Sequence, residues 1–151
     1  MGMSKKINIS TKKLFSVQLK KAIFYAFLEA QKHRSTTIDS QFLLFGILKT
    51  ENSLATKLFQ QLYKSKSSSL DPIDKLLLKL RVNFQLKTKS NSFSTDRIYP
   101  NFSRPVRRLL FFLIKAGQNQ QSSVITTLQV LNYLLRHKYV CKFIKESLVT
   151  S

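Results

Sequence analysis

The feature that most restricts the fold is an internal repeat: the chain of 151 residues contains one pattern twice, with residue 15 matching residue 102. The same offset of 87 residues continues through both copies without a gap. The matched pairs are Phe15 and Phe102, Ser16 and Ser103, Leu19 and Val106, Lys20 and Arg107, Lys21 and Arg108, Ile23 and Leu110, Phe24 and Phe111, Tyr25 and Phe112, Ala30 and Gly117, Ile38 and Ile125, Leu43 and Val130, Leu44 and Leu131, Ile47 and Leu134, and Leu48 and Leu135. A repeat of this kind indicates two structural units of one type.

Both copies place apolar residues at the spacing of an amphipathic helix, and the chain has only three glycines and three prolines. These features favour helices over a turn-rich β fold. Ser16 and Ser103 precede the first helix of each copy, where a serine hydroxyl can accept a hydrogen bond from a backbone N–H of the first turn. We therefore predict an all-α fold in which two pseudo-symmetric repeats pack as one domain.

Caps and apolar spacing predict about seven helices. Their expected limits are 17–32, Asp39 or Ser40 to Leu48, Ser53 to Leu62, Asp71 to Phe84, Ser103 to Ile114, Thr126 or Thr127 to Leu135, and Val140 to Leu148. In the third of these helices we expect Leu54, Leu58, Phe59 and Leu62 to be buried. We also expect Ile38 and Ile125 to be buried at equivalent places in the two repeats.

The composition divides the chain into four parts. Residues 1–14 form a basic extension without acidic residues, and residues 85–101 form the longest polar stretch. The first repeat is predicted to span residues 15–84 and the second residues 102–148, with 85–101 as the linker between them. Because the apolar face of each half needs the other half, residues 15–148 should form one domain.

The charge is strongly basic, with 26 Lys and Arg residues against 7 acidic ones and a net charge of +19. One interpretation is a partner that is a polyanion or an acidic protein. The other is a biased base composition of the genome, because Lys, Asn, Ile and Phe have AT-rich codons. The basic residues are scattered along the whole chain. The charge therefore leaves both interpretations open.

No pattern of the sequence predicts an enzyme, a metal site or a cofactor. Glycine occurs only at positions 2, 46 and 117, so the chain has no GxxxxGK[ST] loop for phosphates. His33 and His137 have no metal-ligand spacing with Cys141. The single cysteine excludes an internal disulfide and favours a reducing compartment. No apolar run approaches the ~18 residues that span a bilayer.

The order of residue types in the first repeat resembles a known module. Phe15 and Ser16 precede a helix with Ala22, Ala26 and Ala30, and Ile38 precedes the run Leu43-Leu44-Phe45-Gly46-Ile47-Leu48. This order is similar to the Clp N-terminal repeat, which occurs twice at the start of Clp-type chaperone ATPases and alone in accessory proteins of plastid Clp proteases. The second repeat departs from it, because Tyr133 replaces the family glycine and Leu113 replaces a small residue.

The resemblance implies a non-catalytic protein-interaction module. Its expected partners are the Clp ATPase, protease subunits, adaptors or substrates. Family precedent, AT-biased composition and the lack of a presequence favour a plastid-encoded protein of the plastid (chloroplast) stroma, with the cytoplasm as the other possibility. The alternative function, based on the net charge, is a nucleic-acid- or ribosome-associated protein that binds phosphates.

The resemblance also implies where ligands would bind. In bacterial members, a glutamate in the bend of each repeat helps to bind phosphorylated arginine. Here those two positions are Gln41 and Leu128, while Ser16 and Ser103 keep the capping hydroxyls. A desolvated guanidinium needs a carboxylate partner. We therefore expect no phosphoarginine binding in the family manner.

A second candidate surface follows from the repeat itself. The aromatic residues are Phe24, Tyr25, Phe111 and Phe112, and the neighbouring basic residues are Lys20, Lys21, Arg107 and Arg108. The aromatics either widen the core or form an exposed patch for a protein partner. The basic pairs either form a solvated face or dock onto an acidic surface.

Overall fold

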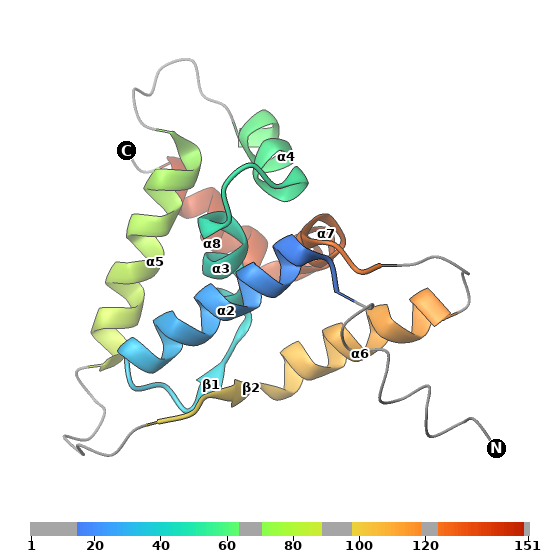
Figure 1. The fold of residues 1–151 in the computed structure, drawn as a ribbon. Helices are drawn as coiled ribbons and strands as arrows, with labels where there is room; N and C mark the ends of the chain where they lie inside the picture. The colour runs from blue at the N-terminus through green and yellow to red at the C-terminus, as the bar shows by residue number, and fades with distance from the viewer. Residues whose placement is uncertain (1–14, 64–70, 89–97, 119–123, 150–151) are drawn as a thin grey trace.

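A computed structural model describes residues 15–63, 71–88, 98–118 and 124–149 (Figure 1). The elements are α2 (Val17–Lys32), β1 (Thr37–Ile38), α3 (Ser40–Lys49), α4 (Leu54–Tyr63), α5 (Pro72–Thr88), β2 (Asn101–Phe102), α6 (Arg104–Gln118), α7 (Thr127–Arg136) and α8 (Lys138–Val149). This part of the chain contains seven helices and two short strands, so the predicted all-α class is confirmed. The basic extension 1–14 lies outside the described residues.

The two repeats are joined by a reciprocal exchange of backbone hydrogen bonds. The N–H of Ser16 donates to the carbonyl oxygen of Ile125 (2.9 Å), and the N–H of Ser103 donates to that of Ile38 (3.0 Å). The 87-residue offset relates these two bonds to each other. Each repeat thus begins by pairing with the bend of the other repeat, as expected for a pseudo-twofold arrangement.

Two short parallel pairings surround these hydrogen bonds. Phe15 forms a bridge with Ile125, and β1 pairs with β2 so that Ile38 lies opposite Phe102. The side chains of Ile38 and Ile125 are only 3% and 1% exposed. The prediction that the two isoleucines are buried at equivalent places is confirmed.

The predicted helix caps largely agree with the structure. Ser16 Oγ accepts from the N–H of Leu19 (3.1 Å), and Asp39 rather than Ser40 caps α3. Thr126 rather than Thr127 caps α7, where it forms a capping box with Gln129. These contacts satisfy backbone donors that a helix leaves unpaired in its first turn.

The helix expected to end near Phe84 instead continues to Thr88. Thr88 Oγ1 donates to the carbonyl oxygen of Phe84 (2.8 Å), and it also contacts His33 Nδ1 (3.2 Å) at the end of α2. Tertiary contact with α2 thus extends α5 into the stretch predicted as linker. Residues 89–97 of that stretch lie outside the described residues.

The expected burial of Leu54 and Leu62 is wrong, since both side chains are exposed. The buried residues of α4 are Ala55, Thr56 and Phe59. Apolar residues occur on two faces of this helix, and only one face can contact the core. The spacing of the apolar residues predicted the helix, but it did not indicate which of the two apolar faces packs against the core.

In the first repeat, α2 and α3 pack backbone to backbone. Ala22, Ala26 and Ala30 are fully buried, and a Cβ added to Gly46 would overlap the carbonyl oxygen of Ala22. No residue with a side chain could occupy position 46 at this spacing. The small residues of α2 and the glycine of α3 therefore determine how close the two helices lie.

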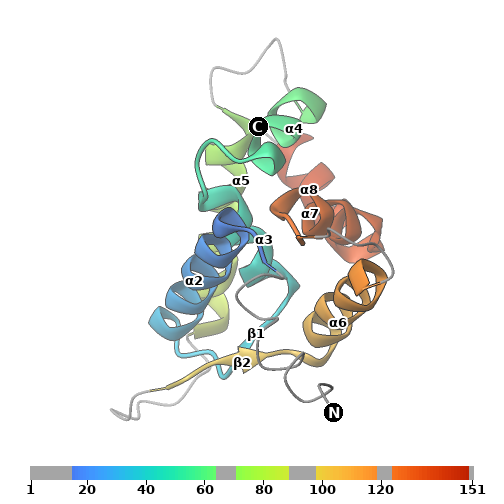
Figure 2. The same ribbon diagram turned by 45° about the vertical axis from the view of Figure 1, so that its right-hand side comes forward.

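The second repeat has larger residues at the equivalent positions. Leu109 and Leu113 take the places of Ala22 and Ala26, and Tyr133 takes that of Gly46. The ring of Tyr133 packs against that of Phe112, with 5.6 Å between centroids. The contact of Phe112 with Tyr133 joins α6 to α7. In Figures 1 and 2, α6 stands at the edge of the molecule, away from α4 and α5.

Candidate functional site

An open apolar groove of about 470 Å³ runs along α6. Its apolar lining residues are Phe15, Phe102, Leu110, Phe111 and Ile114, and its other lining residues are Arg104, Arg107 and Arg108. We refer to the groove lined by these eight residues as the α6 groove. Among the residues that the structure describes, no acidic side chain lines it. It therefore offers apolar surface beside three positive charges.

The α6 groove depends on both repeats. Phe15 and Phe102 are equivalent residues, and each precedes the capping serine of its own repeat. The backbone exchange at Ile125 and Ile38 brings these two segments to the same side of the molecule. Arg104 is the first residue of α6, where the positive end of the helix dipole adds to the charge of the arginines.

The exposed aromatics of the predicted surface do not belong to the core. Phe24 is 57% exposed and Phe111 is 58% exposed, and Phe112 is exposed as well. Tyr25 differs because it is half-buried, with its ring 6.4 Å from that of Phe24. Because the side chains of Phe24, Phe111 and Phe112 are exposed, these residues do not extend the hydrophobic core. Their role in binding stays a prediction.

The structure brings together only some of the aromatic and basic residues that were predicted to form a partner-binding surface. Arg107, Arg108 and Phe111 line the α6 groove together. A further cation lies nearby, since Lys115 Nζ is 5.0 Å from the centroid of the Phe111 ring. Phe112 is not among the lining residues, and its ring contacts Tyr133 instead.

The other half of the predicted surface lies on α2, where Lys20, Lys21 and Phe24 are exposed. Five residues of the α6 groove were not predicted from the sequence: Phe15, Phe102, Arg104, Leu110 and Ile114. The pairing of Phe15 with Phe102 in the repeat was the available signal, because both precede a predicted cap.

The residues at the family's ligand positions are held by contacts within the protein. Ser103 Oγ accepts from the N–H of Val106 (3.4 Å), as Ser16 does at the start of α2. Gln41 Oε1 accepts from Asn83 Nδ2 (2.9 Å) and from Lys87 Nζ (3.4 Å). Leu128 is half-buried on α7 and has no polar group to offer.

A hollow of about 380 Å³ beside Gln41 lies between the two repeats. Its residues are Asp39, Ser40, Gln41, Leu44, Lys87, Pro105, His137, Tyr139, Val140 and Phe143. Asp39 is the acidic residue of this lining, and its Oδ1 already accepts from the N–H groups of Gln41 and Phe42 (3.0 Å each). The carboxylate present here therefore serves as a helix cap.

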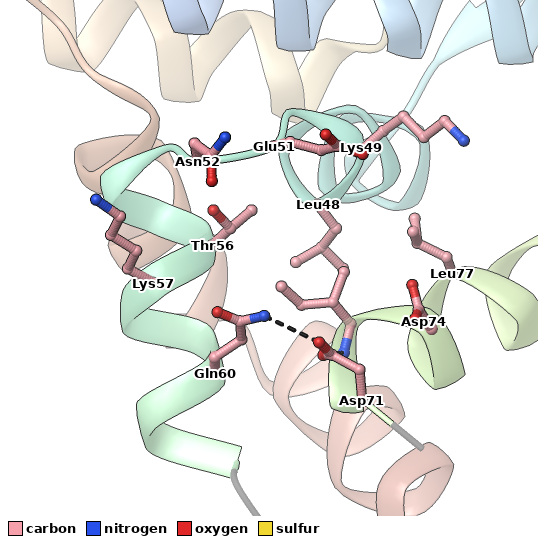
Figure 3. A pocket seen from close by; sticks show the side chains of 11 residues that line it. Leu48, Lys49, Glu51, Asn52, Thr56, Lys57, Gln60, Asp71, Asp74 and Leu77 are labelled. Atoms are coloured by element: carbon pink, nitrogen blue, oxygen red, sulfur yellow. Dashed lines mark hydrogen bonds between the residues drawn. The ribbon is translucent and has the colours of Figure 1, made fainter. Parts of the chain in front are cut away.

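A second hollow of about 380 Å³ lies among α3, α4 and α5 and is shown in Figure 3. It contains Glu51, Asp71 and Asp74, three of the seven acidic residues of the chain. Asp71 accepts from Gln60 Nε2 (2.9 Å) and from the N–H of Ile73 (2.8 Å), which places it at the start of α5. These contacts assign Asp71 a structural role.

Neither a metal-binding group of residues nor a helix able to span a membrane is found in the described part of the chain. No group of three or more His, Cys, Asp or Glu residues there could hold a metal ion. None of its helices is long and apolar enough to cross a membrane.

His33, isolated in the sequence, is buried and pairs with Glu29 (2.9 Å), which also lies 3.4 Å from Arg81 Nε. The sequence signal for this pair was its separation by four residues.

The fold and surface define a class of protein: a double-repeat helical domain that presents apolar and basic groups. The family model described as the Clp repeat (R) N-terminal domain matches residues 14–140. The chain therefore belongs to the Clp N-terminal domain family. No curated protein matches the chain significantly. Membership implies protein–protein interaction in a Clp system.

Proposed function

We propose that this protein is a non-catalytic adaptor or accessory module of a Clp protease, and that it binds its partner through α6. The observation that supports this most strongly is the α6 groove, which combines apolar lining with exposed arginines. Buried aromatics provide most of the affinity at protein interfaces, and charges mainly affect the rate of encounter. The candidate partners are Clp ATPase subunits, protease-ring subunits, adaptors and substrates.

The proposed place of action is the plastid stroma, with the gene in the plastid genome. The supporting observations are the strong lysine and phenylalanine content of the chain and the precedent of accessory Clp proteins in plastids. Fractionation followed by immunoblotting tests this. Enrichment with stromal markers supports the proposal, and enrichment with cytoplasmic markers contradicts it.

The functional proposal is tested by affinity purification of the tagged protein from its native compartment at moderate salt, with and without nuclease. We expect Clp subunits to co-purify after nuclease treatment. Recovery of ribosomal proteins and RNA, lost on nuclease treatment, would instead support the nucleic-acid alternative, which the net charge of +19 favours.

A further inference from the structure

The first helix of the second repeat, α6, is more exposed than α2, the first helix of the first repeat. Leu109, Leu113 and Tyr133 replace two alanines and a glycine. The ring of Tyr133 on α7 contacts that of Phe112 on α6. From Phe111 to Gly117, every side chain of α6 is exposed or half-exposed. The helix is thus available to a partner over much of its length.

The charges along α6 are of one sign. The helix carries Arg104, Arg107, Arg108 and Lys115 and has no acidic residue. A guanidinium presents a planar fork of donors that matches a carboxylate in a bidentate manner. The arginines beside the apolar lining therefore favour a segment that has carboxylates next to apolar side chains.

The equivalent face of α2 has a different chemistry. Val17 takes the place of Arg104, and Lys20 and Lys21 take those of Arg107 and Arg108. Lysine is a strongly hydrated point charge without a planar fork. The α2 face thus has fewer cations and none that can bind a carboxylate with two parallel hydrogen bonds.

We propose that the α6 groove binds an acidic amphipathic segment of a partner protein, and that the equivalent face of α2 does not. Apolar side chains of the segment contact Phe111 and Ile114, and its carboxylates pair with Arg107 and Arg108. A second copy of this chain is a poor occupant, because both copies carry a net charge of +19. The proposal rests on the proposed function and names the partner chemistry of its site.

The test uses the full-length protein and fluorescence anisotropy at physiological salt. The probe is a labelled synthetic helical peptide with leucine on one face and glutamate on the others. Two comparison probes have lysine in place of every glutamate, or serine in place of every leucine. We expect the first peptide to bind and both comparison peptides to bind at least roughly tenfold more weakly. Equal binding of the serine peptide would overturn the proposal.

The repeat supplies matched control variants. Arg107→Glu with Arg108→Glu changes the net charge as much as Lys20→Glu with Lys21→Glu. We expect the first pair to weaken peptide binding by roughly tenfold or more, and the second by less than about twofold. Likewise, Phe111→Ala should weaken binding roughly tenfold, whereas Phe24→Ala should leave it almost unchanged.

Equal effects of the two charge pairs would show attraction by overall charge and would contradict a site on α6. Single-stranded RNA that displaces the peptide while Phe111→Ala has no effect would also contradict it. Failure of the peptide to bind, while purified Clp subunits do bind, would overturn this inference alone. Binding of the peptide without any Clp subunit would instead overturn the proposed function.

Discussion

Gly46 and Tyr133 occupy equivalent positions and give the two repeats different helix spacings. At Gly46 the backbone of α3 contacts that of α2, whereas the ring of Tyr133 contacts Phe112. Replacing the hydrogen atom of glycine by the hydroxybenzyl side chain of tyrosine changes the distance at which two helices can pack. Together with Leu109 and Leu113 in place of Ala22 and Ala26, Tyr133 gives the second repeat larger side chains at these positions than the first.

We predict that Gly46→Ala destabilises the protein by about 1–3 kcal/mol, because the new methyl group overlaps the backbone of Ala22. The free energy of unfolding is measured by chemical denaturation followed by circular dichroism. Gly117→Ala is the control: Gly117 has no positive φ, and alanine there raises helix propensity in α6. Equal stability of wild type and Gly46→Ala would contradict the close packing.

Phosphoarginine should bind far more weakly here than to a family member with both glutamates. The side chain of Gln41 is uncharged and accepts a hydrogen bond from Asn83, and the side chain of Leu128 is apolar. Isothermal titration calorimetry with free phosphoarginine measures this, and a comparable affinity would refute it. Gln41→Glu with Leu128→Glu should raise the affinity, with Gln41→Glu alone as the single-site control.

The helices could be predicted from local sequence, but their tertiary contacts could not. The cap at Ser16 depends on neighbours in the chain, so local spacing was sufficient to find it. The extension of α5 to Thr88 depends on His33, which is far away in sequence, and spacing contains no information about it. Leu54 was placed on the wrong face because apolar residues line two sides of α4.

The candidate site was predictable only in part. The exposed aromatics followed from a second apolar stripe on the helices, and the repeat identified Arg107 and Arg108. The α6 groove itself also needs Phe15, which reaches α6 through tertiary pairing with Ile125. No pattern within one helix indicates such a partner.

We predict that α6 exchanges its backbone amide hydrogens faster than α2. Helix α2 packs three fully buried alanines against the core, whereas α6 is open to solvent beyond Leu110. Local opening is easier where few apolar contacts hold a helix. Hydrogen–deuterium exchange followed by mass spectrometry compares the two helices in one sample. Equal or stronger protection of α6 would contradict this account of the second repeat.

The reciprocal backbone hydrogen bonds of Ser16 and Ser103 connect each repeat to the other. Ile38 and Ile125 are buried at these junctions, so separation would expose both side chains. Two repeats that complete one another should fold as one cooperative unit.

We therefore predict that fragments 1–88 and 89–151 are largely unfolded when separate and gain helix content when mixed. Circular dichroism of each fragment and of the equimolar mixture measures this. Ser16→Pro removes one exchanged N–H and should weaken the association, while Ser4→Pro in the extension is the control. A first fragment that unfolds cooperatively by itself would show that the repeats are independent.

We propose that this protein is an interaction module of a Clp system and that it binds through α6. The most direct test of this proposal is sedimentation of the purified, nuclease-treated protein with purified Clp ATPase and Clp protease core from the same compartment. We predict co-sedimentation with one of these at physiological salt, and a roughly tenfold loss of affinity for Phe111→Ala but not for Phe24→Ala. Binding to RNA without binding to any Clp component would contradict the claim.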